Sequence, residues 1–269
     1  MAVSNFIQTI WSKKIQDDLE IECKLVQNCL RTYEGDVKYA RSVKILGVGE
    51  PTVRKYTGAA ITVEEMSDRG QELVIDQANY FAFHVDDVNQ AQSVPGLMEE
   101  YMAKSKHKLA VERDSYVAGL IKTAANSSTA TALTMEAVKE AIDDGIVELR
   151  LRNFNEQGVI EIDPRAYNVF KNCLITLSTN NPELISRGVV GMYDGFEVVM
   201  SNNLAKDSTH VYCDIRGKKA IAFAGQINEV EALRDQTVFK DLVRGLDTFG
   251  AKVIDENRIQ VIKIPLKAA

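Results

Sequence analysis

The chain has 269 residues, of which 45% are hydrophobic and 26% are charged, values typical of a globular protein. Its 32 basic and 38 acidic side chains give a formal net charge of −6, which argues against nucleic-acid binding through a generally basic surface. No stretch approaches the roughly 18 apolar residues of a membrane span, and the N-terminal sequence lacks the pattern of a secretory signal. Composition therefore predicts a cytoplasmic-type protein with a large core in one or two domains, and it indicates no function.

The N-terminal segment predicts an arm. Its first residues are irregular, and apolar side chains then share roughly one helical stripe: Trp11, Ile15, Leu19, Leu25 and Cys29. A stretch of this length cannot build its own core, so we expect it to pack against something else.

After the arm, the spacing of apolar residues changes from a helical to a strand-like period. Residues 37–63 alternate loosely between apolar and polar side chains and are interrupted by glycines and a proline. This pattern predicts a β-hairpin-like excursion, and because an isolated hairpin is marginal in water, we expect it to rest on a neighbour. Residues 71–87 then predict a strand in which Phe81, Phe83 and Val85 alternate toward a core.

The clearest helical pattern covers residues 95–123. Pro95 suits the first helical turn, and apolar side chains recur at three- and four-residue intervals. At 1.5 Å per residue, this helix would be roughly 40 Å long. Charged side chains, including Arg113, are assigned to its other face, and residues 126–129 (Asn-Ser-Ser-Thr) predict a polar linker.

Strand and helix patterns alternate over residues 130–224, which favours a single packed α/β domain. A helix carries Met135, and a short strand covers residues 159–162. Asp163 and Pro164 then predict the N-cap and first position of a further helix. More strands are predicted at residues 196–200, 210–213 and 220–223, and through the strand-rich segment 225–266.

No catalytic or metal-binding motif accompanies this organisation. The four cysteines have no CxxC spacing and are interpreted as reduced, packed thiols: Cys23, Cys29, Cys173 and Cys213. The segment from Gly47 to Thr52 fails the GxGxxG pattern, because glycine is missing at Thr52 and Pro51 lacks a backbone donor. The GxxxxGK[ST], GxSxG and HExxH patterns are also missing. We therefore expect no cofactor and no metal.

Charged side chains are interpreted mainly as a mixed-charge surface. Arg54 and Lys55 are diluted by nearby acidic side chains such as Glu64 and Glu65. A sharper hypothesis is that these charges are complementary between subunits, where they would set register more than affinity.

Several short segments resemble the major capsid protein of tailed bacteriophages, which has the Hong Kong phage-type coat fold. The similarity is ordered and spaced without large gaps from residue 5 to residue 253. It rests on NFIQTIWS (5–12), YEGDVK (33–38), SVKI (42–45), TV with YT (52–57), DQANYF (76–81), VDDV with AQ (85–92), GFEV with SNN (195–203), VEALRD (230–235) and GAKV (250–253).

The resemblance implies an α+β fold with an N-arm, an extended β-hairpin loop, a peripheral domain with a long spine helix, and an axial α/β domain. It implies five segments: 1–37, the N-terminal arm; 38–85, the extended loop and flanking strands; 86–130, the peripheral domain with the spine helix; 131–224, the axial domain; and 225–269, the peripheral-domain return strands and the C-terminal strand.

The function implied is a non-catalytic coat protein that assembles through hexamers and pentamers into an icosahedral shell around double-stranded phage DNA. Its implied partners are further copies of itself, a scaffolding protein and a portal, with packaged DNA held without specific binding and no membrane. Its implied location is the virion, after synthesis in the bacterial host cytoplasm. Because the arm motif begins at Asn5, we expect any scaffold to be a separate protein or a segment already removed. Candidate inter-subunit contacts are Trp11, Tyr33, Arg54, Lys55, Glu64 and Glu65.

Two other functions remain open at this point. An encapsulin-type nanocompartment shares the fold and encloses cargo enzymes, although the NFIQTIW and YEG segments favour the phage proteins. A cytosolic α/β enzyme would need a convergent polar pocket, for which the sequence offers no triad, metal set or phosphate loop.

Overall fold

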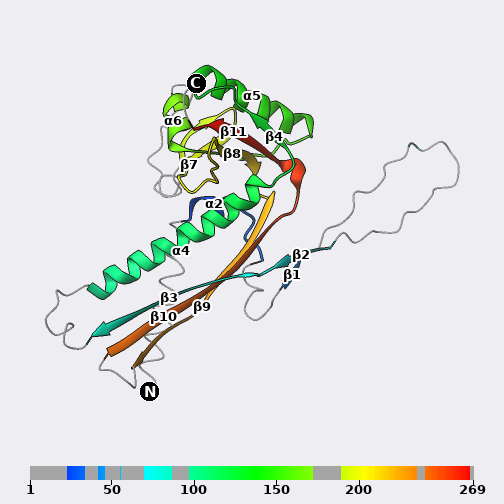
Figure 1. The fold of residues 1–269 in the computed structure, drawn as a ribbon. Coiled ribbons are helices and arrows are strands. Elements are labelled where there is room, and N and C mark those ends of the chain that lie inside the picture. Colours follow the sequence, from blue (N-terminus) through cyan, green and yellow to red (C-terminus); the bar gives the residue numbers. More distant parts are fainter. Residues whose placement is uncertain are drawn as a thin grey trace.

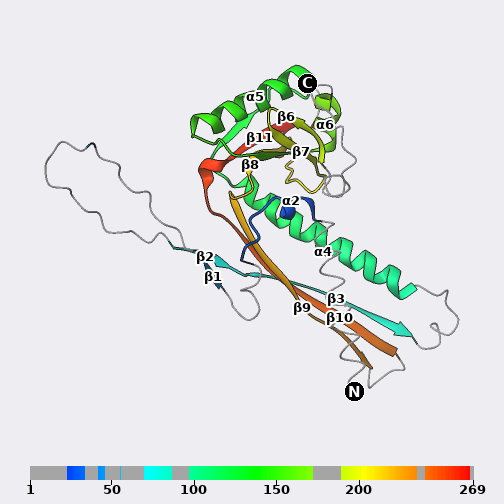
Figure 2. The same cartoon turned by 180° about the vertical axis from the view of Figure 1, so that it is seen from behind.

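The computed structural model describes residues 23–33, 42–45, 55, 70–86, 97–171, 189–234 and 240–266. Figure 1 shows that they form an α/β lobe with helices α5 and α6, and an elongated lobe in which helix α4 runs along a narrow sheet. Figure 2 shows the same two lobes from behind.

The α/β lobe is built on a six-stranded mixed sheet with the strand order β4-β11-β8-β5-β7-β6. Its strands are β4 (Ser127–Thr129), β5 (Gly158–Ile162), β6 (Val189–Tyr193), β7 (Phe196–Met200), β8 (His210–Gly217) and β11 (Ile259–Pro265), and a short 3₁₀ helix, η3 (Glu256–Arg258), precedes β11. Strands β4 and β11 are parallel, as are β5 and β7. Helix α5 (Met135–Leu151) lies on one face, where a Cβ on Gly145 would lie 3.0 Å from the side chain of Ile215 and 3.4 Å from that of Ile262.

Local sequence explains where the helices of this lobe begin. The hydroxyl of Thr134 accepts a hydrogen bond from Ala137 N at the start of α5. Helix α6 (Pro164–Phe170) starts with Pro164 at its first position, and Asp163 accepts a hydrogen bond from Arg165 N. The N-cap and first position predicted from the sequence are therefore confirmed.

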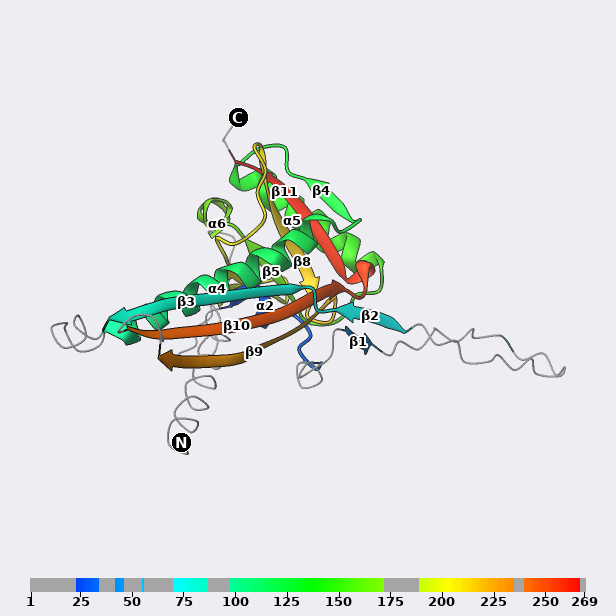
Figure 3. The ribbon, with the colours of Figure 1, turned by 60° about the horizontal axis from the view of Figure 1, so that its bottom comes forward.

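The elongated lobe contains a three-stranded antiparallel sheet with the order β3-β10-β9. The elements are β3 (Gln77–Asp86), β9 (Ile221–Arg234), β10 (Lys240–Val253) and α4 (Leu97–Lys122). Along β10, Val243, Asp247 and Phe249 are buried, whereas Arg244 and Leu246 are exposed. Because side chains alternate across a strand, one face of this sheet packs toward α4 and the other is open among the described residues (Figure 3).

A two-stranded sheet continues from the elongated lobe. Strand β1 (Ser42–Ile45) pairs antiparallel with β2 (Gln71–Val74). Their side chains form a small cluster with the start of β9: Val43, Ile45, Leu73, Ala222 and Ala224. The pairing agrees with a β-hairpin-like excursion. Of the residues 37–63 predicted to form it, the structure describes only 42–45 and Lys55.

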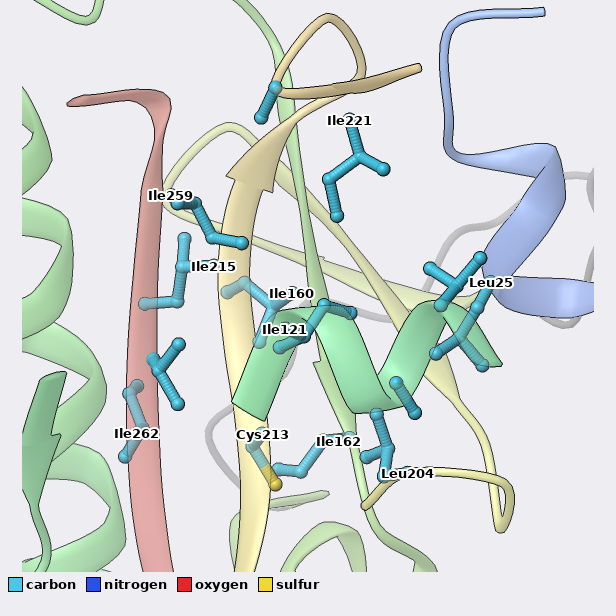
Figure 4. Packing of buried hydrophobic residues seen from close by; sticks show 14 of the residues in the cluster. Leu25, Ile121, Ile160, Ile162, Leu204, Cys213, Ile215, Ile221, Ile259 and Ile262 are labelled. Carbon is cyan, nitrogen blue, oxygen red and sulfur yellow. The ribbon is translucent and has the colours of Figure 1, made fainter. Parts of the chain in front are cut away.

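The start of the described chain enters the main core. Helix α2 (Lys24–Gln27) is a single turn, and Leu30 then forms a parallel bridge with Ala222 of β9. Leu25 is fully buried in the same cluster as Ile121 of α4 and Ile221 of β9, and Figure 4 shows it reaching from α2 toward α4. The part of the predicted arm that the structure describes therefore packs into its own subunit.

Two sequence predictions need correction. Residues 126–129 were predicted as a polar linker, but Ser127–Thr129 form strand β4, because parallel pairing with β11 satisfies their backbone groups. Arg113 was assigned to the polar face of the long helix, but it is only 3% exposed and binds Asp247. The helix itself, the strand at 77–86, strand β5 and the strands from β7 to β11 agree with the sequence patterns, whereas β6 was not predicted.

Two glycines provide a matched test of this packing. A Cβ on Gly250 of β10 would lie 2.2 Å from Val74 O, which belongs to backbone, whereas one on Gly119 of α4 meets nothing within 4 Å. We expect Gly250→Ala to lower the free energy of unfolding by about 1–3 kcal/mol through overpacking. Gly119→Ala should raise it by about 0.5–1 kcal/mol, because glycine is a poor helix former. Urea denaturation of both variants measures the difference, and equal effects would contradict the close β10–β2 approach.

Candidate functional site

A buried carboxylate holds the N-terminal end of helix α2. Asp114 of α4 accepts hydrogen bonds from Lys24 N at 3.0 Å, Leu25 N at 3.1 Å and Val26 N at 3.3 Å. Asn203 Nδ2 donates a fourth, at 3.2 Å. Burial raises the pKa of Asp114 to about 6, although these hydrogen bonds act in the opposite direction. Asp114 thus satisfies backbone donors that a one-turn helix leaves unpaired.

A buried guanidinium holds the other end of α2. Arg216 of β8 donates to Leu25 O at 3.1 Å and to Asn28 O at 3.0 Å. The same side chain binds Glu161 of β5 at 2.7 Å and Asp214 of β8 at 2.9 Å. All three charged side chains have no exposed surface. We call Asp114, Glu161, Asp214 and Arg216 the α2 clamp.

A second buried ion pair fixes α4 on the narrow sheet. Arg113 Nε donates to Asp247 of β10 at 2.9 Å, and Nη2 forms a further hydrogen bond to the same carboxylate. The guanidinium also lies over the rings of Phe223 and Phe249, at 5.7 and 5.8 Å from their centroids. Burial raises the pKa of Asp247, while Arg113 opposes that shift. The pair ties the middle of α4 to both β9 and β10.

The clamp matters because α2 cannot be stable alone. Forming a single helical turn restricts the backbone of several residues but gains few hydrogen bonds. The stability of α2 must therefore come from tertiary contacts. Here those contacts are charged and buried, and removing one partner of such a cluster leaves an uncompensated charge. The clamp therefore fixes the position of residues 24–28, close to the start of the described chain.

The open face of the narrow sheet is a candidate contact surface. Tyr80 of β3 and Leu246 of β10 are directly opposite each other in the ladder and are 78% and 41% exposed. Beside them, Arg244 Nη2 binds Glu231 of β9 at 2.6 Å. An exposed apolar pair with a charged border is typical of a protein contact site. We call this surface, comprising Tyr80, Leu246, Arg244 and Glu231, the open sheet face.

A second exposed apolar pair lies on α5. Val147 and Leu151 are one turn apart and are 53% and 71% exposed. The acidic side chain of Asp144 is also exposed on this helix. Because Arg150 is about half exposed as well, the α5 surface combines an apolar pair with charges of both signs.

The structure describes only two of the six contact residues predicted from the sequence. Tyr33 is half-buried and packs against the small cluster of β1, β2 and β9, so its described contacts lie within its own chain. Lys55 is exposed. The other four lie outside the described residues: Trp11, Arg54, Glu64 and Glu65.

The buried charges on α4 and in the clamp are not evident from the sequence pattern. Arg113 and Asp114 lie on the buried stripe of α4, next to Ala110 and Val117, but charged residues are normally assigned to a solvent face. The available signal was Glu161, a lone acid inside the apolar strand sequence Gly-Val-Ile-Glu-Ile. A buried charge in a strand needs a partner, and here Arg216 supplies it.

No protein-family model matches the chain, and no curated protein matches it. A solved structure from Mycobacterium phage Che8 is 26% identical, with a TM-score of 0.70 over 87% of this chain and 89% of that one. The capsid structure of cyanophage P-SCSP1u is 16% identical, with a TM-score of 0.67 over 88% and 86%.

This chain has the fold of a tailed-phage major capsid protein. The resemblance stated from the sequence is thereby confirmed at the level of the fold. A virus-like particle from Pyrococcus furiosus shares this capsid fold at 11% identity, with a TM-score of 0.59 over 95% of this chain and 99% of that one. Among the helices that the structure describes, none has the length and apolarity needed to cross a membrane.

The α2 clamp of this capsid fold can be tested with a matched pair of arginine variants. Arg216→Met should lower the free energy of unfolding by about 3–5 kcal/mol, because Glu161 and Asp214 would stay buried without a counter-charge. Arg150→Met is the control, since Arg150 and Asp194 are about half exposed and such pairs contribute at most about 1 kcal/mol. Chemical denaturation checks both values, and similar losses from the two variants would refute the clamp.

Proposed function

We propose that this chain is the coat subunit of a tailed bacteriophage and assembles through hexamers and pentamers into an icosahedral shell around double-stranded DNA. The observation that carries the proposal is the likeness to phage capsid structures over more than four-fifths of both chains. The ordered segments from NFIQTIWS to GAKV give independent support from the sequence. The proposed role is structural and non-catalytic, without a cofactor.

The parts of the coat fold correspond to the described elements as follows. We assign α4 as the spine helix, because it runs along the β3-β10-β9 sheet of the proposed peripheral domain. The proposed axial domain is the lobe with α5, α6 and the six-stranded sheet, which also includes β4 and β11 from outside residues 131–224. Residues 1–37 and 38–85 are proposed as the arm and the extended loop.

Shell formation follows from the surfaces that one subunit leaves uncovered. Identical subunits that meet head to tail through two different surfaces close into rings when the rotation permits. The open sheet face supplies an apolar centre with a charged border for such a contact. Complementary charges, including Lys55, would then set the register between copies more than the affinity.

The charge of the chain suits a container for DNA. A net charge of −6 per subunit does not favour strong, sequence-independent attraction to phosphates. We propose that packaged DNA is enclosed without specific binding, that a scaffolding protein and a portal act as assembly partners, and that the protein resides in the virion after synthesis in the host cytoplasm.

The encapsulin-type alternative remains worth testing, because the Pyrococcus furiosus virus-like particle shares the fold. Its identity and TM-score are lower than those of the Che8 structure. The contents of an isolated particle separate the two functions: double-stranded DNA supports the coat protein, and peptide-tagged cargo enzymes support the nanocompartment.

Expression of the full chain tests self-assembly. We expect negative-stain microscopy and light scattering to show closed shells, because the proposed contacts involve only copies of this chain. Coexpression with the scaffolding protein of the same phage provides the assembly-competent control. Particles no larger than a tetramer under both conditions would contradict the proposed function and favour a cytosolic enzyme.

The open sheet face offers a sharper test. Replacing both Tyr80 and Leu246 with glutamate should abolish shells while preserving the fold, because both side chains are substantially exposed in the single subunit. The matched control, Tyr80→Phe with Leu246→Met, keeps the face apolar and should assemble normally. Circular dichroism monitors folding and sedimentation monitors assembly. Normal shells from the glutamate variant would exclude this face as an essential contact.

A further inference from the structure

Two acids of the α2 clamp are neighbours on adjacent strands of the six-stranded sheet. Glu161 of β5 and Asp214 of β8 are direct partners in the antiparallel ladder, and both side chains are fully buried. Glu161 Oε1 accepts from Arg216 and from Asn28 Nδ2, and Asp214 Oδ2 accepts from Arg216 Nε. The other oxygen of each carboxyl, Oε2 and Oδ1, is buried and has no hydrogen-bond partner among the described residues.

The charges around this pair do not balance. Arg216 offers one positive charge to two carboxylates. From α4, Asp114 adds repulsion toward Glu161. Two residues after the end of α2, Cys29 Sγ contacts Arg216, but burial raises the pKa of its thiol to about 11, so it brings no compensating charge. A buried excess of one negative charge is costly, and such groups ordinarily take up a proton instead.

One proton would resolve both problems at once. Bound to one carboxyl and donated to the other, it converts two unpartnered acceptors into one hydrogen bond. It also reduces the charge of Glu161, Asp214 and Arg216 to zero. Pairs of adjacent carboxyls in proteins behave in this way, because two like charges at close range cannot both ionise freely.

We propose that Glu161 and Asp214 share one proton in the folded subunit, and that its loss at alkaline pH loosens the clamp on α2. The same Glu161 oxygen that binds Arg216 also binds Asn28 at the end of α2, so a change of charge reaches the helix directly. Burial is the largest cause that raises the pKa of Asp214 well above its usual range, and the charge of the neighbouring Glu161 is the next largest. This direction agrees with a retained proton.

The direction of the pH effect follows from linkage. An unfolded carboxyl releases its proton near pH 4, whereas the folded pair keeps one at higher pH. The free energy of unfolding therefore falls as pH rises above about 4 and levels off once the pair has ionised. This inference goes beyond the proposed coat function and does not depend on it, because it concerns contacts within one chain.

Asp214→Asn tests the shared proton in the full-length protein. The asparagine oxygen can accept from Arg216 while its amide donates to Glu161 Oε2, so the variant imitates the protonated acid permanently. Relative to this variant, the unfolding equilibrium constant of the wild type should increase with pH, by up to tenfold per unit until the pair ionises. Both proteins contain the same Asp114, Asp247 and buried cysteines. The ratio of their unfolding equilibrium constants therefore reports on the Glu161–Asp214 pair. Asp144→Asn, at an exposed position on α5, should follow the wild-type profile.

Two further measurements cover a failure of that variant to fold. Glu161→Gln imitates the same proton from the other side and should flatten the profile equally. In the unaltered protein, hydrogen exchange of residues 24–30, corrected for intrinsic rates, should become faster at alkaline pH. Parallel pH profiles for wild type, Asp214→Asn and Glu161→Gln would overturn the proposal. So would unchanged corrected exchange at residues 24–30.

Discussion

A one-turn helix held at both ends by buried charge is the constraint on which this subunit depends. Asp114 accepts from the first backbone N–H groups of α2, and Arg216 donates to carbonyls at its end. Neither charge has contact with solvent that could replace these bonds. The docked α2 supplies hydrogen-bond partners for these buried charges, and the charges supply partners for the backbone groups of α2. Each set of groups therefore offsets the cost of removing the other from water.

This docking also joins the two lobes. Asp114 belongs to α4, which runs along the narrow sheet, whereas Arg216 belongs to the six-stranded sheet. Between them, Leu30 bridges to Ala222 at the start of β9. The Arg113–Asp247 pair then continues the connection outward along α4. The two lobes therefore form one body, and that body carries the open sheet face.

The sequence predicted the elements whose signal is local. Asp163 and Pro164 specify a helix start within two residues, and the long stripe of α4 was evident from its period. The clamp was not predictable in this way, because Asp114 meets Leu25 from 89 positions away in the chain. Strand β4 was missed because Ser127–Thr129 are polar and become a strand only by pairing with distant β11. The fold itself came from resemblance between short segments, since periodicity does not specify which strands become neighbours.

The most direct measurement is an electron cryomicroscopy reconstruction of the assembled particle. We expect residues 23–30 to pack into the core of their own subunit, between Asp114 and Arg216, while another copy covers Tyr80 and Leu246. A particle in which the α2 segment is supplied by a neighbouring subunit, or in which the open sheet face remains in solvent, would contradict it.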